Sequence, residues 1–102
     1  MKKITVMVTG VGGGSHGEQI IKALRMANTP YEIIGCDMLP YASGFKKVDY
    51  SYIVPPARDP NYIPKILDIC KKHNVKAIFH GSEQDLLVHN HHREIFENEG
   101  IF

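Results

Sequence analysis

The chain has 102 residues, of which 43% are apolar and 23% are charged, and its formal net charge is +1. Such a length holds one domain with one hydrophobic core, and the apolar content excludes intrinsic disorder. The basic residues are scattered rather than gathered on one face, and no apolar stretch has the length of a membrane span, so we expect neither nucleic acid nor a membrane as a partner.

The first half of the chain alternates strand-like and helix-like segments. Residues 4–8 form an almost continuous apolar, β-rich run, which is typical of a strand covered on both faces of a parallel sheet. A glycine-rich loop follows, and apolar residues then recur at helical spacing over residues 17–28. Residues 31–36 predict a second strand. The stretch 38–47 is irregular, with room for one helical turn.

Residues 50–54 predict a short third strand, which two prolines stop. The helix that follows must begin late, because Pro64 lacks an N–H group and fits only into a first turn. Capping by Asn61 places Pro64 at the third helical position, whereas capping by Asp59 would place it one turn too deep. We therefore expect the helix to begin after Asn61.

The last part of the chain predicts one more strand and two helices. Residues 75–79 form the strand, and Ser82 with Asp85 three residues later predicts a helix cap. A final helix ends at Gly100. The alternation predicts a three-layer, Rossmann-like α/β fold as a single domain over residues 1–102, with a four-stranded parallel sheet in the order 3-2-1-4 and helices on both faces.

Sheets of this type bind ligands at the carboxyl ends of their strands, where the strand order reverses. We therefore expect a crevice between the loops after the first and fourth strands. It would bring the glycine-rich loop near residues 80–83.

The glycine-rich loop matches a dinucleotide-binding fingerprint. Residues 12–17 fit G-x-G-x-x-G after a strand and before a helix, and Asp37 ends the second strand where a dinucleotide fold places the acid for a ribose hydroxyl. Against this, Glu18 in the first helical turn would repel a pyrophosphate. The alternative is a tight turn with close helix–strand packing, and we favour it.

Other polar residues provide few candidates for chemistry. His89 and His92 are three residues apart and could share a metal, but supporting ligands at set spacing are missing, so we favour a solvated polar helix connection and expect no metal site. Capping explains Ser82, whereas Glu83 is a candidate ligand contact at the strand ends. No nucleophile–base pair stands out, so we name no catalytic residue.

The N-terminus and the cysteines bear on the compartment. The apolar run after Met1 stops at Val8 and is too short for a signal peptide. Cys36 and Cys70 have neither metal spacing nor the density of a disulfide scaffold. We therefore expect buried, reduced thiols in a cytoplasmic protein.

The order and spacing of several short motifs resemble the opening domain of carbamoyl-phosphate-synthase-like ATP-grasp proteins, the Rossmann-like domain that precedes the ATP-grasp fold. The resemblance covers nearly the whole chain and rests on residues 8–14 followed by 20–25, 52–57 with Asp59-Pro60, Gly81-Ser82-Glu83, and 93–96. The sequence departs from the family in a longer stretch at 15–17 and in His80, where relatives often have proline.

The resemblance implies a parent enzyme that uses ATP and Mg²⁺ to activate a carboxylate as an acyl phosphate and couples it to an amine or thiol. The nucleotide would lie between lobes further along the chain, so we expect no cofactor on this domain itself. The domain would supply one wall of the substrate crevice through Gly12, Gly13, Gly14, Ser15, Ser82 and Glu83.

The implied partners are the downstream ATP-grasp lobes of the same chain and a small-molecule substrate, with a homodimer left open. Because relatives run on past the position of Phe102, we expect the chain to be part of a longer protein and inactive alone. Two alternatives remain: the NAD(P)-binding domain of an oxidoreductase, with Asp37 on the ribose, and a non-catalytic interaction module.

Overall fold

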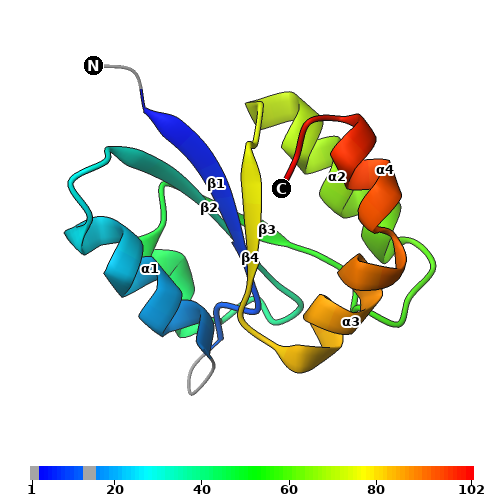
Figure 1. Ribbon diagram of the computed structural model, residues 1–102. Coiled ribbons are helices and arrows are strands. Elements are labelled where there is room, and N and C mark those ends of the chain that lie inside the picture. Colours follow the sequence, from blue (N-terminus) through cyan, green and yellow to red (C-terminus); the bar gives the residue numbers. More distant parts are fainter. Residues whose placement is uncertain (1–2, 13–15) are drawn as a thin grey trace.

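The structure is a computed structural model and describes residues 3–12 and 16–102. Its elements are β1 (Ile4–Thr9), α1 (His16–Met26), β2 (Tyr31–Asp37), the 3₁₀ helix η1 (Ser43–Lys47), β3 (Tyr50–Ile53), α2 (Tyr62–His73), β4 (Ala77–His80), α3 (Glu83–His91) and α4 (Arg93–Asn98). The four strands are parallel and lie in the order β3-β2-β1-β4 (Figure 1), which confirms the predicted sheet.

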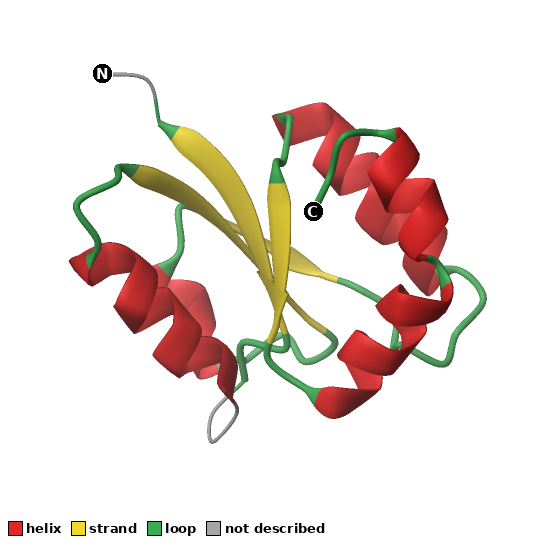
Figure 2. Cartoon of the chain, in the orientation of Figure 1, coloured by secondary structure: helices red, strands yellow, loops and turns green. Residues whose placement is uncertain are grey.

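Helices cover both faces of the sheet, with α1 and η1 on one side and α2, α3 and α4 on the other (Figure 2). Successive side chains of a strand point to opposite faces, so the central strands contribute to two cores. In β1, Val6 and Val8 pack toward α1, whereas Met7 packs with α2. This two-sided burial explains why the central strands read as continuous apolar runs.

The fourth strand begins later than the sequence predicts. Asn74 ends α2 in the left-handed conformation with φ of 55°, and the N–H of Val75 then donates to the Cys70 carbonyl at 3.0 Å. Val75 is therefore a buried part of the helix cap rather than the first strand residue. On the outer edge of β4, the backbone of Phe102 bonds to Lys76 and Ile78, each at 2.9 Å.

The predicted start of α2 is confirmed, but the capping side chain differs. Pro64 is the third residue of the helix. Asn61 lies in the helical region (φ −85°, ψ −6°) and its side chain makes no cap bond. Asp59 prepares the turn instead, because its Oδ1 accepts from the Asn61 N–H at 2.8 Å and its carbonyl accepts from the Tyr62 N–H at 3.0 Å.

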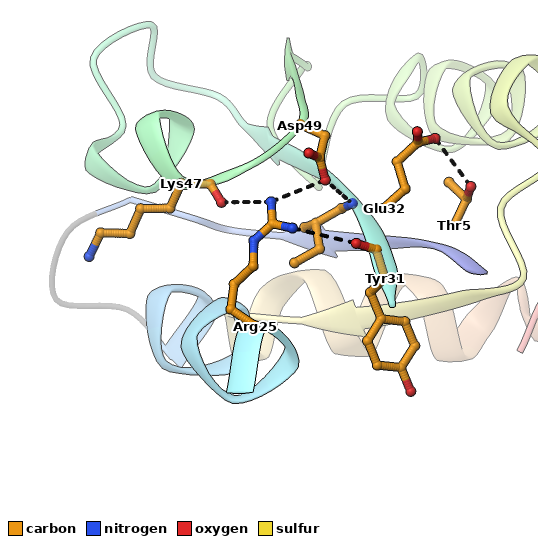
Figure 3. Close-up of polar contacts among 7 residues, drawn as sticks. Thr5, Arg25, Tyr31, Glu32, Lys47 and Asp49 are labelled. Carbon is orange, nitrogen blue, oxygen red and sulfur yellow. Dashed lines mark hydrogen bonds and ion pairs between the residues drawn. The ribbon is translucent and has the colours of Figure 1, made fainter. Parts of the chain in front are cut away.

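A polar cluster pins α1 to the β2–β3 connection (Figure 3). Arg25 donates to the carbonyls of Tyr31 and Lys47, at 3.4 and 3.1 Å, and to Asp49 Oδ2 at 3.0 Å. The same Asp49 oxygen accepts from the Ile33 N–H at 2.8 Å. These contacts lie near the start of β2. They therefore stabilise the sheet at the amino ends of its strands, opposite the carboxyl-end loops.

Both cysteines, Cys36 and Cys70, are free and buried, as predicted. Among the described residues, none of the helices is both long and apolar enough to cross a membrane.

Candidate functional site

A cavity of about 440 Å³ opens at the carboxyl ends of the strands. Its walls come from the ends of β1 and β2, the loop after β3, and the first turns of α2 and α3. The lining residues are Thr9, Gly10, Gly12, Cys36, Asp37, Met38, Leu39, Val54, Pro55, Pro56, Ala57, Tyr62, Ser82, Gln84 and Asp85. It lies at the strand ends where parallel α/β sheets bind their ligands.

Glycines bring three elements together beside this cavity. Gly10 has a φ of +65°, and a Cβ there would lie 3.1 Å from Asp85 Oδ2. A Cβ at Gly17 would lie 2.3 Å from the Gly10 carbonyl oxygen, and one at Gly81 would lie 2.5 Å from the same atom. Only glycine permits such close approach of β1, α1 and β4. Close packing of helix and strand therefore explains Gly17, as favoured from the sequence.

Asp37 fastens the loop after β1 to the loop after β2. Its Oδ2 accepts from the Gly12 N–H at 2.8 Å, and its Oδ1 accepts from the Leu39 N–H at 3.0 Å. Gly12 and Asp37 both line the cavity. The other members of the predicted loop, Gly13, Gly14 and Ser15, lie outside the described residues.

The first turn of α3 forms another wall. Ser82 is the N-cap, and its Oγ accepts from the Asp85 N–H at 3.2 Å, which confirms the predicted cap. Ser82, Gln84 and Asp85 line the cavity. Glu83 is exposed and is not among the lining residues, so its contact with a substrate stays a prediction.

Hydrogen bonds connect two cavity-lining side chains to histidines beside the cavity. The Tyr62 hydroxyl and His89 Nε2 form a hydrogen bond of 2.9 Å, and Thr9 Oγ1 lies 3.2 Å from His80 Nδ1. The two imidazole rings are 4.3 Å apart. Burial, with smaller contributions from the charges of His80 and His92, lowers the pKa of His89 to about 3, so this side chain is neutral.

The expectation of a solvated helix connection is wrong for His89. Only 5% of this residue is exposed, because Tyr62 and Phe96 enclose its ring, and its Nδ1 has no hydrogen-bond partner among the described residues. His92 is exposed, and its Nδ1 bonds to the Val88 carbonyl at 2.9 Å. The described part of the chain contains no group of three histidine, cysteine or acidic side chains that could hold a metal.

Sequence reasoning missed two walls of the cavity. It placed the crevice between the loops after β1 and β4, whereas the cavity extends across the loop after β3 to Tyr62. The paired prolines Pro55 and Pro56 mark that loop, but we interpreted them as a strand stop and as part of the family resemblance, not as a cavity wall. Asp85 was assigned to capping alone, although its side chain also lies against Gly10.

Comparisons with known proteins agree with this architecture. The family model described as the PylC-like N-terminal domain matches residues 6–102, which include all the cavity-lining residues. The bifunctional purine biosynthetic protein PUR2,5 of Pichia angusta is 31% identical over 87 residues. That alignment covers 85% of this chain and 10% of the relative.

Proposed function

The chain belongs to the PylC-like N-terminal domain family, a domain that precedes the ATP-grasp fold in ATP-grasp enzymes, and from this membership we propose that it positions the substrate of an ATP-dependent ligase. The ligase is of the carbamoyl-phosphate-synthase-like kind. It activates a carboxylate as an acyl phosphate: a carboxylate oxygen attacks the γ-phosphorus of ATP and ADP leaves. A nucleophile then attacks the acyl carbon, and inorganic phosphate leaves with the C–O bonding electrons.

One observation supports this role above the others: the cavity lies at the strand ends and joins the glycine loop to the first turn of α3. Gly12, Gly13, Gly14, Ser15, Ser82 and Glu83 are the proposed substrate contacts. The contribution of such a wall is orientation and exclusion of water from an acyl phosphate that water would hydrolyse. ATP and Mg²⁺ belong to the lobes of the longer protein, which works in the cytoplasm.

The contacts of Asp37 disfavour the dinucleotide alternative. Both of its carboxylate oxygens accept backbone N–H groups, from Gly12 and Leu39, so a ribose would have to compete for them. Glu18 also accepts a hydrogen bond from the Ser43 hydroxyl, and its charge at the start of α1 opposes a pyrophosphate.

Trapping of the acyl phosphate tests the proposal. The full-length protein is incubated with MgATP, hydroxylamine and a mixture of amino acids and other small carboxylic acids. Hydroxylamine converts an acyl phosphate to a hydroxamate, which mass spectrometry identifies. We expect hydroxamate and ADP in equal amounts. Absence of carboxylate-dependent ADP formation, or a reading frame that ends at Phe102, would contradict the ligase assignment.

A pair of methionine substitutions tests the site. Met38 lines the cavity and is 52% exposed, whereas Met26 at the end of α1 is outside it and 77% exposed. Met38→Trp should obstruct the cavity and lower kcat/KM of the coupling reaction about tenfold or more, which corresponds to about 1.4 kcal/mol, without changing the KM for ATP. Met26→Trp is the matched control. Wild-type kinetics in Met38→Trp would show that the cavity is not the substrate site.

A further inference from the structure

The charged groups that line the cavity are all of one sign. Its described lining includes two carboxylates, Asp37 and Asp85, and no lysine or arginine. Both carboxylates lie against the same short loop: Asp37 bonds to Gly12 at 2.8 Å, and Asp85 Oδ2 lies 3.1 Å from the position of a Cβ on Gly10. The loop therefore lies between two negative charges.

Neither carboxylate forms an ion pair with a described residue. The ion pairs in the described part of the protein join Arg25 to Asp49, Lys71 to Glu99 and Arg93 to Glu97, and none of them includes a cavity residue. Burial is the largest cause that raises the pKa of the Cys36 thiol. Cys70, Asp85 and Asp37 raise it further, and the positive charge of Lys65 acts in the opposite direction.

Two described backbone donors that could bind an anion already have acceptors in the protein. The exposed N–H groups of a glycine loop or a helix N-terminus are common sites for phosphate. Here the Gly12 N–H donates to Asp37, and the Asp85 N–H in the first turn of α3 donates to Ser82 Oγ. A phosphate or carboxylate in this cavity would replace these acceptors and would also approach two like charges.

The remaining wall is aliphatic. Met38, Leu39, Val54, Pro55 and Ala57 line the cavity and carry no charge. Of these, Met38 and Leu39 are about half exposed, at 52% and 56%, although both are large apolar side chains. An alkyl chain in contact with this wall would remove their apolar surface from water.

We infer that the cavity binds an aliphatic amine in its ammonium form, with the nitrogen near Asp85 and the alkyl chain along the Met38 wall. This inference rests on the proposed function and extends it, because it assigns to this domain the amine substrate rather than the carboxylate or the nucleotide. The carboxylate would then enter from the side of the ATP-grasp lobes.

Three probes of matched chain length test the charge preference: n-pentylamine, 1-pentanol and pentanoate. The full-length protein carries ¹³C-methyl methionine, and the signals of Met38 and Met26 are assigned from their leucine variants. At neutral pH pentylamine is cationic, because alkyl ammonium groups titrate near the lysine value of about 10.4. We expect pentylamine to shift the Met38 signal saturably and to bind about tenfold or more tightly than pentanoate. The Met26 signal should not move.

Asp85→Asn should weaken the binding of pentylamine about fivefold. Its affinity for pentanol should stay unchanged, which would show that the cavity itself is intact. Asp68→Asn makes the same chemical change at an exposed position of α2 outside the cavity and should have no effect. Preference for pentanoate, no saturable Met38 shift with any probe, or full pentylamine affinity in Asp85→Asn would overturn the inference. A negative hydroxamate assay alongside pentylamine selectivity would instead contradict the ligase assignment.

Discussion

The substitution Gly17→Ala separates the effect of helix propensity from that of packing, because the two predict changes in stability of opposite sign. Gly17 is the second residue of α1 and is buried. If propensity decided the outcome, alanine would stabilise the helix by up to about 1 kcal/mol. A Cβ at this position, however, would lie 2.3 Å from the Gly10 carbonyl oxygen and 2.9 Å from its carbon.

The size of the stability loss depends on how far the Gly10 carbonyl group can move away from the new Cβ. The oxygen would have to retreat by about 0.7 Å to reach the shortest acceptable contact of 3.0 Å. It is confined on its other side, since a Cβ at Gly81 would lie 2.5 Å from the same oxygen. Overpacking against backbone costs about 1–3 kcal/mol. We expect a net loss of about 2 kcal/mol, which lowers Tm by roughly 8–16 °C in a domain of this size.

Urea and thermal unfolding followed by circular dichroism measure this change. Ala23→Gly, at an exposed position of α1, calibrates helix propensity in the same helix and should cost up to about 1 kcal/mol. If Gly17→Ala raised Tm, or left it unchanged while Ala23→Gly lowered it, the close approach of α1 to the β1 loop would be refuted.

Three further predictions concern the core, the pH dependence and nucleotide binding. Tyr62→Phe leaves both ring nitrogens of the buried His89 without a hydrogen-bond partner among the described residues. The free energy of unfolding in urea should therefore fall by about 1–3 kcal/mol, and adding His89→Leu should restore part of this loss. Burial alone would raise the pKa of Asp49, but hydrogen bonds from Ile33 and Arg25 lower it in the folded protein. The Asp49 carboxylate therefore stabilises the fold fully above its unfolded-state pKa near 3.9, and this stabilisation disappears as the pH falls through its folded-state pKa. Asp49→Asn should be less stable than wild type by about 1 kcal/mol at neutral pH and equally stable in acid, as measured by urea unfolding. Calorimetric titration of this chain with MgATP should give no saturable binding in the low micromolar range, and tight NAD binding that Asp37→Ala abolishes would favour the oxidoreductase alternative.

Much of the fold could be predicted because its signals are local. The apolar runs and helical spacings define the elements, and the alternation of strand and helix restricts the sheet to very few orders. Pro64 located the start of α2 through its missing N–H group, and Ser82 located the start of α3. Each of these inferences depends on residues no more than a few positions apart.

The interior of the site depended on contacts between distant residues. His89 lies in a polar stretch, so its sequence neighbours indicate solvent, yet packing against Tyr62, His80 and Phe96 buries it. Asp37 was considered for a ribose, and its bond to Gly12, 25 positions away, was not visible in the sequence.

The sequence by itself thus determined the sheet and its layers, because the periodicity of a strand or helix is a property of neighbouring residues. It also predicted the end of the sheet at which the cavity lies. Only the tertiary structure decided what that end contains. The loop after β3 became a cavity wall and Asp85 met Gly10 through the packing of α2 and α3. The negative charge of the cavity, and with it the inferred preference for an amine, is a consequence of that packing.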